Sequence, residues 1–311
     1  MRSPVSFTSR YLERVAKTKS VLCVGLDPTP AHVPLILRSG YDSIKDIEHY
    51  IQRVIAMAAP LVPVVKPQVA YYSALGPDGL SMLRRLIDYA HSLGLLVILD
   101  AKRGDTVETM VQYGKEVFVQ LDVDACTFIP YLGPTFNPSW LEWLAQGRMV
   151  ITMVRTSNPE AKVIQDLVVE GGVDDLKVYE YVAACASEWN AEVRKLTNGA
   201  GSVGGVVGAT WPEQAPRCRE LAGDEVFFLI PGYGAGQGGD ADGAVAALPN
   251  SRGELMGTIN NSRGLTFYSW WDKEKKQPRE GDALKLVEAA IRASNKDLNA
   301  ALDRKLGVPV L

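Results

Sequence analysis

Short apolar runs alternate with longer amphipathic stretches along the chain. The stretches Ile44–Ala59, Gly79–Leu93 and Leu176–Leu196 repeat their apolar residues at helical spacing. Alternation of this kind is typical of repeated strand-helix units around a parallel sheet. The eight candidate strands are Val21–Leu26, Leu61–Pro67, Leu95–Ala101, Ala125–Pro130, Met149–Arg155, Gly204–Ala209, Val226–Ile230 and Glu254–Asn260.

Eight such units predict an α/β fold of the (β/α)8 TIM-barrel type, with residues 1–311 forming a single domain. Within it, residues 265–311 are expected to hold the final barrel helix and a surface extension. This segment contains Trp270, Trp271 and the amphipathic stretch Asp282–Ser294. The alternative architecture is a doubly wound open sheet. That sheet would favour a G-x-G-x-x-G turn after the first strand, which Gly25–Pro28 does not supply.

Composition and charge narrow the possible partners. The chain is 47% hydrophobic and 22% charged, which is typical of an ordinary globular protein. The net charge is −3, and the basic residues are scattered, so no patch for nucleic acid or an anionic membrane is expected. Met1–Pro4 begins no apolar leader, and no window approaches the ~20 apolar residues of a membrane span. A cytoplasmic location is the expectation.

Cysteine and histidine offer little site chemistry. The cysteines include no C-x-x-C pair, which favours small buried thiols over a zinc site or a disulfide framework. None of the histidines adjoins a strand end, so neither a histidine-based triad nor a histidine metal site is expected. These residues are Cys23, Cys126, Cys185 and Cys218, and His32, His49 and His91.

Polar residues follow nearly every predicted strand. In a parallel barrel the carboxyl ends of the strands surround the catalytic mouth, so these positions predict a ligand site. They are Asp27, Lys66, Asp100, Lys102, Thr127, Thr156, Ser157, Thr210, the loop Pro231–Gly239, Ser262 and Arg263.

The densest cluster of charge is the run Asp100–Asp105. Asp100 and Lys102 are two residues apart, so a regular pleat would place both side chains on one face. Asp105 lies beyond the strand and could turn back into the site or reach a neighbouring subunit. Taken alone, the run fits a solvated charge cluster equally well.

A second constellation could hold a phosphate. Glycines of the loop Gly232–Gly239 expose backbone N–H groups, and Arg263 offers a planar fork of donors. The loop alone fits a flexible hairpin or lid equally well, but its pairing with Arg263 favours phosphate binding.

The ordered set of motifs resembles one family. Asp100–Asp105 is similar to the signature of orotidine 5′-phosphate decarboxylases, particularly the longer bacterial-type (type 2) group. The resemblance extends from Val21 to Gly264 and includes further segments in the family's order. These are Val24–Pro28, Val65–Gln68, Thr156–Pro159, Pro231–Ala235 and Asn261–Gly264.

The resemblance implies a decarboxylase of de novo pyrimidine biosynthesis that converts orotidine 5′-monophosphate (OMP) to UMP and CO2 without cofactor or metal. Lys102 would stabilise and then protonate the C6 carbanion, within an array completed by Asp100, Asp105 and Lys66. The resemblance also implies a homodimer in which Asp105 and Thr109 enter the partner's active site. The implied substrate-binding residues are Asp27, Thr109, Ser157, Gln237, Arg263, Gly234 and Gly264.

The chain departs from the family pattern in two places. Gly236 interrupts the usual glycine-loop spacing before Gln237, and Thr106–Glu108 replace an isoleucine and small residues. Two alternatives are a metal-dependent barrel resembling hexulose-phosphate aldolases and a non-catalytic barrel that binds a nucleotide or sugar phosphate. Lys66 argues against the first because a cation there opposes a divalent ion.

Overall fold

The structure is a computed structural model, and its description covers most of the chain. The described residues are 5–29, 33, 43–170, 175–234, 237–267, 280–307, 309 and 311.

Eight parallel strands close into one barrel in sequence order, with β1 paired to both β2 and β8. The predicted (β/α)8 fold is therefore confirmed, and each strand overlaps its predicted range. The strands are β1 (Leu22–Leu26), β2 (Val64–Pro67), β3 (Leu96–Arg103), β4 (Ala125–Phe128), β5 (Met149–Arg155), β6 (Ser202–Val207), β7 (Phe228–Ile230) and β8 (Gly257–Asn261).

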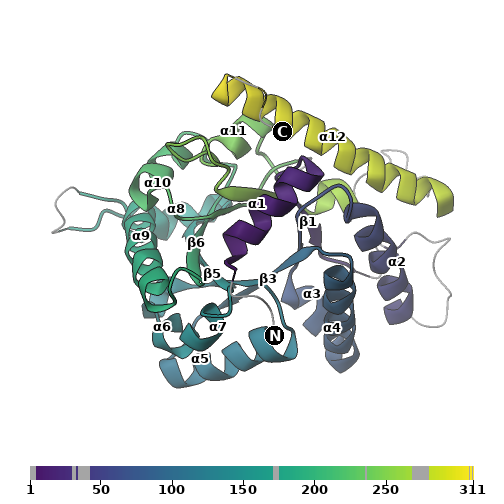
Figure 1. Ribbon diagram of the computed structural model, residues 1–311, viewed down its shortest axis with the longest axis horizontal. Helices are drawn as coiled ribbons and strands as arrows, with labels where there is room; N and C mark the ends of the chain where they lie inside the picture. Colours follow the sequence, from purple (N-terminus) through teal and green to yellow (C-terminus); the bar gives the residue numbers. More distant parts are fainter. Residues whose placement is uncertain are drawn as a thin grey trace.

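Helices surround the strands (Figure 1). They cover the barrel because their apolar faces pack on the outward side chains of the strands. None of the helices in the described part of the chain combines the length and apolar character that a membrane span needs. The α-helices are α1 (Phe7–Thr18), α2 (Ser43–Ala58), α3 (Val69–Ser73), α4 (Gly76–Ser92), α5 (Val107–Gly114), α6 (Phe136–Ser139), α7 (Leu141–Leu144), α8 (Lys162–Gln165), α9 (Val178–Leu196), α10 (Ala215–Ala222), α11 (Ala241–Val245) and α12 (Glu280–Leu306).

Helix α1 precedes the barrel and was not predicted. Its buried side chains include Phe7 and Tyr11, one helical turn apart, and both rings pack edge-on against Phe227. The hydroxyl of Tyr11 donates to the carbonyl of Gly257, 2.8 Å away at the start of β8. Helix α1 thereby covers the amino-terminal end of the barrel, and it crosses the centre of the view in Figure 1.

The predicted amphipathic stretch near the carboxyl terminus lies within α12, which continues to Leu306. Buried residues recur along its length, from Ala283 to Leu302. Trp270 and Trp271 lie outside the described residues.

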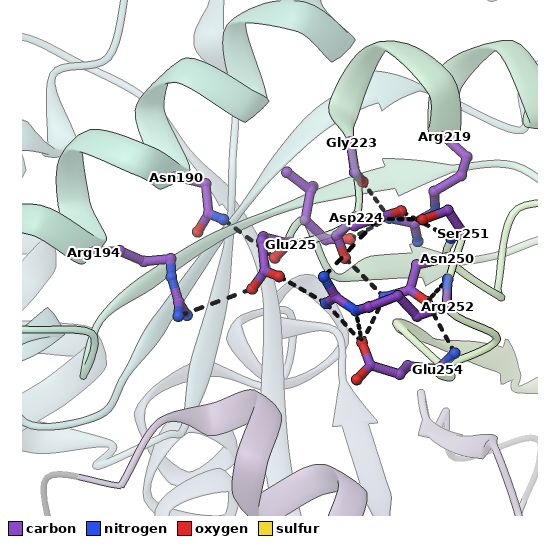
Figure 2. A network of polar contacts seen from close by, with 11 residues as sticks. Asn190, Arg194, Arg219, Gly223, Asp224, Glu225, Asn250, Ser251, Arg252 and Glu254 are labelled. Carbon is purple, nitrogen blue, oxygen red and sulfur yellow. Dashed lines mark hydrogen bonds and ion pairs between the residues drawn. The ribbon is translucent and has the colours of Figure 1, made fainter.

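The amino-terminal ends of β7 and β8 are joined by a polar network (Figure 2). The guanidinium of the buried Arg219 donates to four backbone carbonyls at 2.6–3.0 Å. Nearer the surface, Arg252 lies 2.7 Å from carboxylate oxygens of both Glu225 and Glu254. Because this network lies at the end of the barrel opposite the carboxyl ends of the strands, its role is structural.

Candidate active site

A cavity of about 450 Å³ opens at the carboxyl ends of the strands. It is lined by seven of the eleven catalytic and substrate-binding residues that the family resemblance implies. Barrel enzymes place their chemistry at this end of the barrel. The lining residues are Asp27, Lys66, Gln68, Tyr71, Asp100, Lys102, Thr127, Met153, Thr156, Ser157, Asn158, Val206, Leu229, Pro231, Gln237, Asn260, Ser262 and Arg263.

One carboxylate links two ammonium groups in this cavity. The Oδ1 atom of Asp100 lies 2.6 Å from Nζ of Lys102, and its Oδ2 atom lies 3.2 Å from Nζ of Lys66. Lys66 is buried, whereas the side chain of Lys102 is 43% exposed. Both lysines line the cavity, and Lys102 has the more accessible ammonium of the two.

The charges of this array support one another. Burial opposes the charge of Lys66, but Asp100 and Asp27 outweigh it and raise the pKa of Lys66. Burial likewise opposes the charge of Asp100, but Lys66 and Lys102 outweigh it and hold the pKa of Asp100 well below its usual range. Lys66 and Asp100 therefore stay ionised at neutral pH.

The backbone that presents Lys102 is not a regular strand. The register of the pairing of β3 with β4 shifts from Leu99 to Arg103, and Lys102 has a φ of 47°. The predicted proximity of Asp100 and Lys102 is therefore achieved through an irregular backbone rather than a simple pleat. Arg103 points away from the cavity and forms an ion pair with Glu116 at 2.6 Å.

Asp27 follows β1 and is held by the neighbouring strand. Its Oδ1 atom accepts a hydrogen bond from the backbone N–H of Gln68 at 3.1 Å. Asp27 is half-buried and lines the cavity near Lys66, where its carboxylate can accept from a ligand.

The turn after β5 is fixed through all the polar groups of Thr156. Its N–H donates to Oε1 of Gln165 and its Oγ1 accepts from Nε2 of the same residue, both at 3.1 Å. Its carbonyl accepts from Nε1 of Trp211 at 2.8 Å. These contacts hold the adjacent Ser157 at the cavity wall.

The loops after β7 and β8 meet around one amide. A Cβ on Gly234 would lie 2.5 Å from Nδ2 of Asn261, and a Cβ on Gly264 would lie 2.7 Å from its Oδ1. The N–H of Gly264 donates to the same Oδ1 at 3.1 Å. Gly234 and Gly264 therefore allow the loops that carry Gln237 and Arg263 to approach closely, although neither glycine lines the cavity.

Asp105 and Thr109 lie outside the cavity of their own chain. The Oδ1 atom of Asp105 accepts from the N–H of Thr106 at 2.7 Å, and the hydroxyl of Thr106 lies 3.3 Å from that of Thr109. Within the described residues, Asp105 forms no ion pair with Lys66 or Lys102. Gly236, the extra glycine, lies outside the described residues.

The inward-facing side chains deeper in the cavity were not predicted from the sequence. Met153, Val206, Leu229 and Asn260 project inward from successive strands β5 to β8. Asn260 is buried, and among the described residues its Oδ1 has no hydrogen-bond partner. Asn260 is the last residue of the predicted strand Glu254–Asn260, so a polar residue at the carboxyl end of a strand was the available signal for it.

A family model, two proteins of similar sequence and a solved structure that match this chain all bear the name OMP decarboxylase. Residues 20–267 match the family model described as "Orotidine 5'-phosphate decarboxylase / HUMPS family". A Dechloromonas aromatica protein named orotidine 5′-phosphate decarboxylase is 40% identical over 254 residues, which are 81% of this chain and 86% of that protein. The protein of the same name from Haloarcula marismortui is 37% identical over 283 residues, covering 89% and 92%. The solved structure of Leishmania donovani OMP decarboxylase superposes with a TM-score of 0.70 at 29% identity, covering 94% of this chain and 99% of that one.

Proposed function

The chain belongs to the orotidine 5′-phosphate decarboxylase / HUMPS family, and we propose that it decarboxylates OMP through the ammonium of Lys102. The activity, which yields UMP and CO2 in pyrimidine biosynthesis, is supported by the family match and by the curated relatives. The observation that carries the mechanism is the Asp100 carboxylate held between Lys66 and Lys102 inside the cavity.

The reaction requires stabilisation of negative charge. Cleavage of the bond between C6 and the carboxylate releases CO2 and leaves the electron pair on C6, with no adjacent electron sink in the ring. A fixed ammonium beside C6 stabilises that charge most effectively when water is excluded. Nζ of Lys102 then transfers a proton to C6 to give UMP, and Lys102 regains a proton from solvent.

Asp100 and Lys66 hold the lysine ready for this step. The carboxylate 2.6 Å from Nζ attracts the ammonium and restricts its position. Lys66 balances the second oxygen of Asp100, which reduces the cost of holding these ions in a partly buried site.

Residues that line the cavity would bind the substrate. Asp27 and Lys66 would bind the ribose hydroxyls, and Ser157 would hydrogen-bond the pyrimidine. Gln237 and Arg263 would hold the phosphate, and Gly234 and Gly264 would let the two loops that carry them approach each other. Binding energy from the distant phosphate can then order the charged array around the ring.

We further propose a homodimer with shared active sites, in which Asp105 and Thr109 complete the site of the other subunit. Support comes from the position of Asp105 outside its own cavity, beside exposed apolar side chains. Tyr131 is 87% exposed and Leu132 is 50% exposed. This segment adjoins the run that holds Asp105, because the N–H of Ile129 donates to the carbonyl of Arg103 at 2.8 Å.

The proposed chemistry uses no added cofactor or metal, and one assay tests it. Purified protein is mixed with OMP in excess EDTA, and the loss of orotidylate absorbance is followed. We expect turnover under these conditions. A folded protein without turnover would contradict decarboxylation and favour a binding barrel. Activity that disappears with EDTA and returns with a divalent ion would contradict the metal-free mechanism.

A further inference from the structure

The hydroxyl of Thr127 contacts three consecutive residues of β3: Asp100, Ala101 and Lys102. Thr127 is buried on β4, and its side chain lines the cavity. Its Oγ1 accepts from the N–H of Ala101 at 3.0 Å and from the N–H of Lys102 at 2.9 Å. The same oxygen lies 2.9 Å from Oδ1 of Asp100.

The direction of each hydrogen bond follows from the chemistry of a hydroxyl. A threonine hydroxyl has one hydrogen to donate and two lone pairs to accept with. Both lone pairs are occupied by backbone N–H groups, so the hydrogen points to Asp100. The Oδ1 atom of Asp100 thus accepts from Thr127 and from Nζ of Lys102 together.

The strand geometry explains why a side-chain acceptor is needed here. In the pairing of β3 with β4, Leu99 is opposite Cys126 and Arg103 is opposite Phe128. Three residues of β3 therefore bulge opposite Thr127 alone, and the regular register of the ladder is interrupted at Ala101 and Lys102. At this interruption the hydroxyl serves as the acceptor for both N–H groups.

The bulge also contains an unfavourable backbone conformation. Lys102 has a φ of 47°. Residues other than glycine rarely adopt this backbone conformation, and it persists only where the surrounding structure enforces it. Among the described contacts of this segment, the bond from the N–H of Lys102 to Thr127 acts directly on that conformation.

We propose that Thr127 is a positioning residue for decarboxylation: its hydroxyl fixes the carboxylate of Asp100 and the strained backbone of Lys102, and so places the Lys102 ammonium. This inference rests on the role proposed above for Lys102. Thr127 needs no contact with the reacting atoms, because it acts through two residues that have such contact.

The test compares Thr127→Val, which keeps the shape and removes the hydroxyl, with Thr127→Ser, which keeps the hydroxyl. We expect Thr127→Val to lower kcat about 10-fold to 100-fold, because the Asp100 carboxylate loses a hydrogen bond. KM for OMP should change less than about threefold. Thr127→Ser should keep kcat within about fivefold of the wild type, because serine retains the same donor and acceptors.

Thr152→Val is the matched control. Thr152 is fully buried on β5 and pairs with Phe128, and within the described part of the chain its Oγ1 has no hydrogen-bond partner. We expect wild-type kcat from this variant. Should Thr127→Val prove poorly folded, Thr127→Ala removes the same hydroxyl and is expected to show the same loss of kcat.

Thermal melting and UMP affinity, measured for every variant, separate positioning from general destabilisation. Wild-type kcat in a folded Thr127→Val or Thr127→Ala variant would overturn the inference. Equal losses in Thr127→Ser and Thr127→Val, or a loss confined to KM, would also overturn it. If Lys102→Ala retains activity, the proposed function fails instead, whereas an inactive Lys102→Ala beside a fully active Thr127→Val refutes only the role of Thr127.

Discussion

The guanidinium of Arg155 stacks on the indole of Trp211, with its central carbon 4.2 Å from the ring centroid. Arg155 is fully buried at the end of β5, where Asp166 balances its charge at 3.0 Å. The N–H of the same indole donates a hydrogen bond to the carbonyl of Thr156. Trp211 therefore links a buried cation to the turn that presents Ser157 to the cavity.

We expect Trp211→Phe to raise KM for OMP about fivefold, the size expected for loss of one neutral hydrogen bond. The ring under Arg155 is retained, but the carbonyl of Thr156 loses its donor, so Ser157 is held less firmly. Steady-state kinetics measure the effect. Trp189→Phe on α9 is the control, because the Trp189 ring packs on Phe136 and does not line the cavity. Identical KM values in both variants would contradict the proposed link.

Lys102→Ala should lower kcat on the order of 10³-fold or more, since it removes the charge that stabilises the carbanion and the proton donor. UMP binding, measured by calorimetry, should remain detectable because the phosphate-binding residues are unchanged. Lys115→Ala is a suitable control, because Lys115 is an exposed lysine outside the cavity. Full activity of Lys102→Ala would refute the mechanism.

The pairing of Asp100 with Lys66 predicts a pH-dependent stability. Because the pKa of Asp100 is lowered in the folded protein, its contribution is present above the unfolded value of about 3.9 and is lost as the pH falls toward the folded value. The raised pKa of Lys66 keeps its contribution present up to about pH 10, where the unfolded lysine titrates.

Urea unfolding of the wild type and Asp100→Asn should therefore differ most near pH 7. We expect the difference in unfolding free energy to shrink between about pH 4 and pH 3, as the unfolded aspartate binds a proton. A difference that stays constant over this interval would show that the ion pair does not shift the pKa of Asp100.

Shared active sites predict complementation between two inactive variants. Asp105→Asn and Lys102→Ala chains, mixed and allowed to exchange subunits, form mixed dimers with one native site and one doubly altered site. A statistical mixture should regain about a quarter of wild-type activity, because half of the dimers are mixed and each has one active site. Each variant incubated alone is the control. A mixture that stays inactive after exchange, verified by native mass spectrometry, would place Asp105 in its own subunit's site.

The sequence alone identified the barrel and most of the residues around its mouth. Apolar runs followed by polar residues are local signals, so the strand Met149–Arg155 was predicted with the bounds that the structure has. Lys66, Asp100 and Lys102 were placed in one site because the carboxyl ends of parallel strands converge. Helix α1 was missed, although Phe7, Tyr11 and Val15 repeat at helical spacing.

Only the tertiary structure decided how those residues are held. The bulge opposite Thr127, the hydrogen bonds of Thr156 and the contact of Gly234 with Asn261 all depend on how segments distant in sequence are aligned. Hydrophobic periodicity reports which face of a segment is buried, but it contains no information on strand register or on the partner of a given hydroxyl. The sequence therefore determined which chemical groups reach the mouth of the barrel, and strand register decided which of them lie within hydrogen-bonding distance.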